Sequence, residues 1–173
     1  MTIQLHSTDF ELFGVPARFA QDGASLDARW KELQREVHPD RFAAQGPAAQ
    51  RVAAQWSARV NEAYRRLKDP QRRAAYLCEL NGAPIEAESN TAMPPEFLLQ
   101  QMELREQLDA ARRVTDLDQI ALHSAQMQRE ALQKIEHQID ADHDWTGAAQ
   151  SVRALMFLHR LTVDIERQRD TFT

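Results

Sequence analysis

Two features of the sequence predict an all-α fold built in two parts. The composition favours helix, because 43% of the 173 residues are hydrophobic and 27% are charged, while seven are Val and six are Ile. A large sheet is therefore disfavoured. The turn-forming residues are unevenly spread, since all seven prolines and four of the five glycines lie at or before Pro95. We expect several short helices before Pro95 and a few long helices after it.

Charge and cysteine content exclude several classes of protein. The formal net charge is −5, which disfavours non-specific binding to nucleic acid. A single cysteine, Cys78, permits neither an internal disulfide nor a thiolate metal cluster within one chain. No apolar run is long enough to span a membrane, and the N-terminal residues lack the apolar core of a signal peptide. We expect a cytoplasmic protein without a cofactor, a bound metal, a nucleic-acid partner or a membrane partner.

Residues 1–81 are predicted to form one domain of four helices, with a loop through Gly46 between the second and the third. Capping and turn residues mark where the helices begin and end. They are Thr8, Glu11 and Gly14 for the first helix, Asp22 and Pro39 for the second, Pro47 for the third, and Asp69, Pro70, Asn81 and Gly82 around the fourth, Gln71 to Leu80. Apolar residues at helical spacing give the second and third helices a core face. They are Leu26, Trp30, Leu33 and Val37 in the second and Val52, Trp56, Val60, Ala63, Tyr64 and Leu67 in the third.

Residues 82–95 are rich in turn formers and are predicted to be a linker, and residues 96–173 are predicted to form an antiparallel three-helix bundle. The expected helices run from Glu96 to Arg113, from Asp116 to about Ile139, and from Trp145 to about Arg169. Thr115 with Asp118 and Asp144 are the expected caps of the last two helices. The core faces of these two helices contain Leu117, Ile120, Met127, Leu132, Ile135 and Ile139, and then Trp145, Val152, Leu155, Met156 and Ile165.

The tripeptide His38-Pro39-Asp40 ends the second helix. Taken alone it fits a polar helix-ending turn, and no serine or cysteine nucleophile stands beside it. Its context is more specific, because an amphipathic helix precedes it and a loop and a second amphipathic helix, with Asn61-Glu62-Ala63-Tyr64-Arg65-Arg66-Leu67, follow it. This arrangement resembles the J domain of co-chaperones that activate DnaK-type chaperones. In that family the tripeptide triggers ATP hydrolysis by the chaperone.

The resemblance implies that the second helix presents basic residues to the chaperone. The residues that can supply this surface are Arg29, Lys31, Arg35 and Arg41. Complementary charge of this kind sets orientation and association rate. Glu36 departs from the family pattern, because generalist J domains usually carry Lys or Arg at this position, and the departure suggests a dedicated chaperone partner. The alternative for these charges is a solvated helix with ion pairs one turn apart.

The helix that begins at Glu96 has two apolar faces. At about 100° per residue, the arc expected to face the bundle contains Phe97, Leu104, Leu108 and Ala111. Apolar residues and carboxylates share the opposite side, namely Leu98, Leu99, Met102, Glu103 and Glu106. An apolar patch rimmed by carboxylates fits a partner-binding surface, and it equally fits a surface that packs on the first domain.

Four segments together resemble the HscB family of co-chaperones from end to end. They are the start Phe-x-Leu-Phe-Gly-x-Pro at 10–16, the J domain, the proline-containing linker and the helix with Phe-Leu-x-x-x-Met-Glu-Leu-Arg-Glu at 97–106. The resemblance implies a non-enzymatic protein with two partners. One is an IscU-type iron–sulfur scaffold protein held by the C-terminal bundle, and the other is an HscA-type DnaK-family chaperone activated by the J domain.

The same resemblance implies that the scaffold contacts the five residues of the outer face and Phe157 on the last helix, although Phe157 could equally be a core residue. We expect a monomer. One alternative is a J-domain co-chaperone for a different client. A more remote alternative is a small helical metal-binding or enzymatic bundle, which would need histidines and carboxylates converging inside the bundle, whereas the core-facing positions assigned here are apolar.

Overall fold

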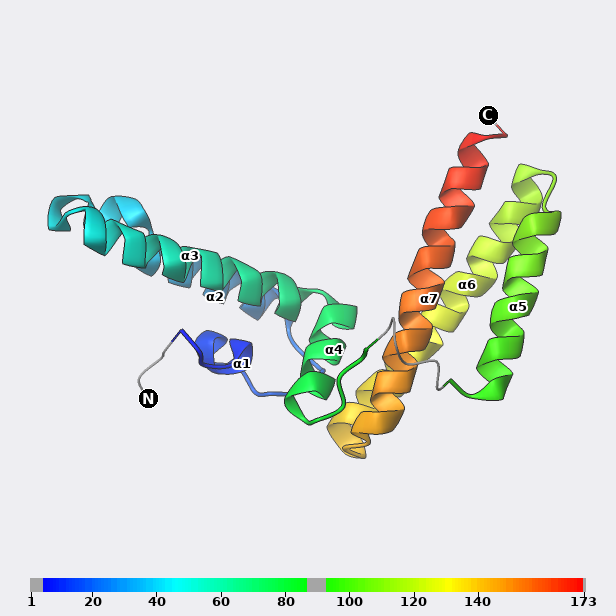
Figure 1. Cartoon of the computed structure of the whole chain (residues 1–173), viewed down its shortest axis with the longest axis horizontal. Helices are drawn as coiled ribbons and strands as arrows, with labels where there is room; N and C mark the ends of the chain where they lie inside the picture. Colours follow the sequence, from blue (N-terminus) through cyan, green and yellow to red (C-terminus); the bar gives the residue numbers. More distant parts are fainter. Residues whose placement is uncertain (1–4, 87–92, 173) are drawn as a thin grey trace. The chain divides into compact units, whose positions relative to one another are not determined.

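The computed structural model of the protein describes residues 5–86 and 93–172. Every regular element in these two ranges is a helix (Figure 1), as the composition predicts. Contacts divide the chain into two units, Met1–Leu77 and Cys78–Thr173. This division falls within the fourth predicted helix, and residues 87–92 of the predicted linker lie outside the described residues, so the boundaries at 81 and 95 stay predictions. None of the described helices is long and apolar enough to cross a membrane.

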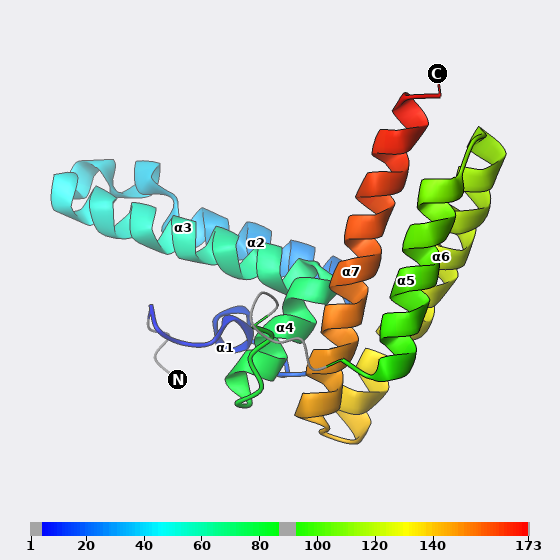
Figure 2. The same cartoon turned by 45° about the vertical axis from the view of Figure 1, so that its right-hand side comes forward.

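The first unit is built on a hairpin of two antiparallel helices, α2 and α3 (Figures 1 and 2). Its elements are α1 Asp9–Phe13, α2 Gly23–Val37, the 3-10 helix η1 Pro39–Gln45, α3 Pro47–Lys68 and the greater part of α4 Pro70–Leu80. Most of the expected loop between the hairpin helices is therefore a 3-10 helix. Pro39 stands at its first position, where the missing N–H of proline costs no intrahelical hydrogen bond.

The predicted caps of the first unit are confirmed. The Thr8 hydroxyl accepts a hydrogen bond from the Glu11 N–H at 3.2 Å, and the Glu11 carboxylate accepts one from the Thr8 N–H at 2.8 Å. Gly14 ends α1 with a positive φ of 64°, a conformation that favours glycine. The carboxylate of Asp22 accepts a hydrogen bond from the Ser25 N–H at 3.1 Å and so caps α2.

The predicted core face of the hairpin is confirmed except at its far end. Leu26 and Leu33 of α2 and Val60, Ala63 and Leu67 of α3 are buried. Val52, however, is 53% exposed, and Ala53 is buried in its place. At about 100° per residue, Ala53 lies roughly 20° from the buried Val60 around the helix, whereas Val52 lies roughly 80° from it. Ala53 is therefore nearer the centre of the packed face than Val52 is.

Polar contacts lock α2 against α3 along the edge of this core. The indole of Trp30 stacks on the ring of Tyr64 with centroids 5.0 Å apart, and its Nε1–H donates to the Asn61 side chain at 2.9 Å. Near the start of α2, the Tyr64 hydroxyl and the Lys68 ammonium both donate to Asp27, at 2.7 and 2.6 Å. Together these two donors hold the pKa of the Asp27 carboxyl below its ordinary value. The hairpin is therefore a rigid support for the turn that joins its helices.

The second unit is a three-helix bundle. Its elements beyond α4 are α5 Pro95–Ala110, α6 Val114–Glu136, the π-helix η2 His137–Ala141 and α7 Trp145–Asp170. Figures 1 and 2 show the three long helices side by side. Their shared core is apolar and consists of Leu104, Leu108, Ala111, Leu117, Ile120, Phe157, Leu158, Leu161 and Ile165. The predicted bundle is thus present, with most of its predicted core residues inside.

The junction between α5 and α6 differs from the prediction. The helix α5 ends at Ala110 rather than Arg113, because Ala111 has an extended ψ of 132°. The carboxylate of Asp116 accepts hydrogen bonds from the N–H groups of Arg112 and Arg113, each at 3.1 Å. Asp116 therefore caps α6, whereas Thr115 with Asp118 was predicted. The other predicted cap is confirmed, since the Asp144 carboxylate accepts from the Gly147 N–H at 2.9 Å at the start of α7.

Candidate functional site

The His38-Pro39-Asp40 turn lies where α2 ends and η1 begins. His38 leaves the helix with an extended ψ of 127°, and Pro39 starts the 3-10 helix. The Asp40 N–H donates to the His38 Nδ1 at 3.3 Å, and the Asp40 carboxylate lies 3.5 Å from the same nitrogen. The side chains of His38 and Asp40 are 55% and 90% exposed, so both can meet a partner.

The basic residues around this turn are not equivalent. Lys31 and Arg35 are exposed on α2. Arg29 pairs with Glu32 at 3.2 Å, one helical turn away. Arg41 directs one guanidinium nitrogen to the main-chain carbonyl of Arg35 at 2.9 Å. Lys31 and Arg35 therefore present exposed cations on α2, while the charges of Arg29 and Arg41 have partners within the unit.

Polar residues that sequence reasoning missed hold the end of the hairpin in place. The Gln34 side chain donates to Asn61 at 2.8 Å and accepts from the Ser57 hydroxyl at 3.0 Å. This links α2 to α3 within one turn of His38. The signal in the sequence was the spacing of Ser57 and Asn61, which are four residues apart and share a face of α3. A polar pair beside an apolar stripe also fits a solvated edge, so sequence alone gave it no role.

The outer face of α5 is an exposed apolar patch. Leu98, Leu99 and Met102 are 42%, 61% and 59% exposed, and Glu103 and Glu106 beside them are exposed as well. The opposite face of the same helix buries Leu104 and Leu108 in the bundle core. The predicted division of α5 into an inner and an outer face is confirmed. We call Leu98, Leu99, Met102, Glu103 and Glu106 the α5 patch.

Phe157 requires a correction. The resemblance implies that Phe157 contacts the scaffold, and such a contact needs an accessible side chain. Phe157 is instead 3% exposed and belongs to the bundle core. The ring meets Phe97 edge to face with centroids 5.8 Å apart, and the Arg105 guanidinium lies 5.5 Å from its centroid. Arg105 in turn pairs with Asp164 at 3.0 Å. Phe157 therefore packs against the inner face of α5 and is not part of the exposed surface.

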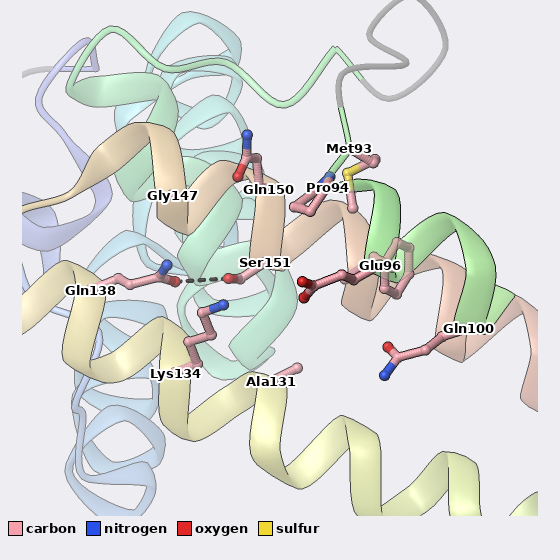
Figure 3. A pocket seen from close by; sticks show the side chains of 12 residues that line it. Met93, Pro94, Glu96, Gln100, Ala131, Lys134, Gln138, Gly147, Gln150 and Ser151 are labelled. Atoms are coloured by element: carbon pink, nitrogen blue, oxygen red, sulfur yellow. Dashed lines mark hydrogen bonds between the residues drawn. The ribbon is translucent and has the colours of Figure 1, made fainter.

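A separate pocket opens between the start of α5 and the neighbouring ends of α6 and α7 (Figure 3). Its volume is about 230 Å³, and Figure 3 shows Glu96 and Lys134 pointing into it from different helices. The Gln138 side chain accepts from the Ser151 hydroxyl at 2.8 Å on its wall. None of the predicted site residues lines this pocket.

The described residues contain no group of three or more His, Cys, Asp or Glu side chains that could hold a metal ion. Cys78 is buried, and loss of solvation raises the pKa of its thiol to about 11, with Arg153 opposing the shift. A thiol with so high a pKa is a poor metal ligand and a poor nucleophile at neutral pH.

Known proteins share both the sequence and the fold. Residues 93–166 match the family model described as the HSCB C-terminal oligomerisation domain. A co-chaperone protein HscB homolog from Burkholderia thailandensis is 47% identical over 169 residues, which cover 96% of each chain. The chain belongs to the HscB family of co-chaperones. An HscB homolog from Bordetella petrii is 46% identical over 164 residues, covering 92% of this chain and 95% of the relative.

Solved HscB structures have the same architecture. Chaperone HscB from Vibrio cholerae superposes with a TM-score of 0.80 at 36% identity, over 96% of this chain and 100% of that one. Human co-chaperone HscB gives 0.89 at 25% identity, over 98% and 85% of the two chains. The Jac1 co-chaperone from Saccharomyces cerevisiae, at 0.74 and 19% identity, is alike in fold. The predicted family and its all-α J-domain co-chaperone fold are confirmed.

Proposed function

We propose that this HscB-family protein binds an IscU-type iron–sulfur scaffold protein, delivers it to an HscA-type chaperone of the DnaK family and stimulates the ATPase of that chaperone. The observation that carries the proposal is the exposure of Leu98, Leu99 and Met102 on α5, in a different unit from the exposed His38-Pro39-Asp40 turn. Two surfaces on two units let one chain hold a client and engage a chaperone. The iron–sulfur cluster is the cargo of the scaffold and has no part in this protein's own structure.

The two surfaces suit different tasks. Apolar side chains at the centre of an interface carry much of its affinity, so the α5 patch is the part expected to hold the scaffold. Its rim carboxylates, Glu103 and Glu106, favour a partner surface that offers cations or hydrogen-bond donors. The turn offers the polar groups of His38 and Asp40 beside the cations Lys31 and Arg35, which suits orientation and rapid association with an acidic chaperone surface.

The substitution His38→Gln tests the role of the turn. Its side chain is exposed, so we expect the variant to keep the fold, with a change in unfolding free energy within about 0.5 kcal/mol. Binding of the scaffold should also be unchanged, because the α5 patch lies in the other unit. Stimulation of the chaperone ATPase, measured in a steady-state phosphate-release assay, should be lost. A folded His38→Gln protein that stimulates normally would refute the J-domain role.

Calorimetric titration with the cluster-free scaffold tests the client. Binding of the scaffold by the wild-type chain supports the proposal. If the chain stimulates the chaperone but does not bind the scaffold, the protein is a J-domain co-chaperone for a different client. Because the ATPase assay and the titration use different partners, each half of the proposal can fail alone.

A further inference from the structure

The last carbonyls of an α-helix have no N–H four residues later in the same helix, and in α2, which ends at Val37, the Arg35 carbonyl is one of them. In an α-helix each carbonyl accepts a hydrogen bond from the N–H four residues later. For Arg35 that residue is Pro39, which has no N–H. The last turn of α2 therefore lacks a donor at the point where the functional tripeptide begins.

The Arg41 side chain supplies that donor. Its guanidinium Nη1 donates to the Arg35 carbonyl oxygen at 2.9 Å. The main-chain N–H of Arg41 also donates to the His38 carbonyl at 3.0 Å. Between these two bonds the Asp40 N–H donates to the His38 ring at 3.3 Å. Arg41 thus joins the turn to the end of α2 through its side chain and to His38 through its main chain. His38 and Asp40 lie between these two bonds in sequence.

Electrostatics favour the same contact. The carbonyl end of a helix carries partial negative charge, so a guanidinium is stabilised there and its hydrogen bond is stronger than one from a neutral donor. The bond occupies one of the five N–H donors of arginine. The planar guanidinium of arginine holds its N–H donors in a fixed geometry, whereas the ammonium of a lysine is a flexible point charge. Arginine is therefore better suited than lysine to hold this carbonyl in one orientation.

We propose that Arg41 is a positioning residue: its guanidinium replaces the helix-capping donor that Pro39 removes and thereby fixes the orientation of His38 and Asp40. The sequence alone assigned Arg41 to the charged surface that meets the chaperone. The new role concerns the geometry of the free protein, and its consequence for the chaperone rests on the proposed function.

A double-mutant cycle between Arg41 and Pro39 tests the geometry without any partner. In the wild-type background, Arg41→Gln should raise the unfolding equilibrium constant by about five- to tenfold, because a charged donor to a carbonyl is lost. In the Pro39→Ala background, residue 38 is no longer biased away from helical ψ. The helix can then continue and bring the restored N–H to the Arg35 carbonyl, so the same substitution should raise the unfolding equilibrium constant by less than about twofold. Urea denaturation followed by circular dichroism measures all four proteins. Equal effects of Arg41→Gln in the two backgrounds would overturn the proposal.

Amide hydrogen exchange locates the effect. Arg41→Gln should speed exchange of the Asp40 N–H several-fold, since the bond to the His38 ring loses its support. The matched control is Arg65→Gln, which removes an exposed arginine of α3 and should leave that amide unchanged. Exchange at Asp40 that does not respond to Arg41→Gln would contradict the positioning role, whatever the stability data show.

Titration of the chaperone ATPase separates positioning from simple charge attraction. If Arg41→Gln misplaces the tripeptide, the variant should stimulate the ATPase less than the wild-type chain even at saturating concentration. If the variant loses only a charge contact, the maximal stimulation should stay the same and only the half-saturating concentration should rise. The latter result would overturn the functional consequence of the proposal. If the wild-type chain gives no stimulation at all, the proposed function fails, and the double-mutant cycle still decides the role of Arg41 in the free protein.

Discussion

The Asp9 carboxylate is fully buried at the start of α1, between two arginines of α3. Its oxygens lie 2.6 Å from the Arg59 guanidinium and 3.3 Å from that of Arg66. The main-chain N–H of Asp9 donates a hydrogen bond to the Tyr76 hydroxyl of α4 at 3.1 Å. This one residue therefore ties the N-terminal helix to α3 and to α4, at a position that the sequence shows only as part of a capping segment.

We expect Asp9→Asn to lower the free energy of unfolding by about 3 kcal/mol, because removing one partner of a buried ion pair leaves the other charges uncompensated. Urea denaturation measures the loss. Glu62→Gln is the matched control, since Glu62 also contacts Arg66, at 2.7 Å, but is 61% exposed. An exposed pair contributes less than about 1 kcal/mol, so equal losses from the two substitutions would contradict the assignment.

Burial of the Cys78 thiol is expected to make the stability of the protein depend on pH in the alkaline range. Burial raises the pKa of its thiol to about 11, so the folded protein holds this proton more tightly than the unfolded chain does. The resulting stabilisation is complete below the ordinary thiol pKa and is lost as the pH rises through about 11. We expect stability to fall over this range and the thiol to react with a disulfide reagent at pH 8 only after denaturation. Cys78→Ala should remove this alkaline component, and rapid labelling of the native protein would disprove burial of the thiol.

At the scale of elements, α5 carries both a core face and an exposed apolar face. We expect the double substitution Leu99→Ala with Met102→Ala to lower the unfolding free energy by no more than about 1 kcal/mol, because both side chains are exposed. Leu104→Ala with Leu108→Ala should cost several kcal/mol, roughly 2–5 for each buried leucine. Thermal unfolding distinguishes the two pairs on one helix.

The same Leu99→Ala and Met102→Ala protein should bind the scaffold much more weakly in calorimetry, while its direct stimulation of the chaperone stays unchanged. A strongly destabilised protein would mean that the patch is buried against another part of the chain. A stable protein with unchanged titration would leave the α5 patch without the proposed role.

At the scale of the whole molecule, charge opposes self-association through the α5 patch. Two copies docked by this face would bring Glu103 and Glu106 of each copy against like charges, which disfavours the contact. We therefore expect the purified chain to be a monomer of 19.8 kDa, measured by size-exclusion chromatography with light scattering. A dimer that Leu99→Ala with Met102→Ala converts to a monomer would show instead that the patch joins two copies.

The sequence by itself determined the features that depend on a few neighbouring residues. The Thr8 and Glu11 capping box, the Gly14 helix end and the caps Asp22 and Asp144 all appear as predicted, because each needs a short stretch of chain in one conformation. The two-faced character of α5 was equally predictable, since 3.6 residues per turn sort side chains by spacing alone. The family followed from motifs spread along the chain.

Tertiary structure decided the rest, because it depends on which surfaces meet. Helical spacing leaves a residue at the edge of a face undetermined, so packing alone could bury Ala53 in place of Val52 and place Phe157 under α5. Burial of Asp9 required two arginines, 50 and 57 residues further along the chain, to converge on it. The Arg41 bond to Arg35 arises only when η1 turns the chain back toward α2. Contacts between residues distant in sequence, or around an irregular turn, have no local pattern from which they can be predicted.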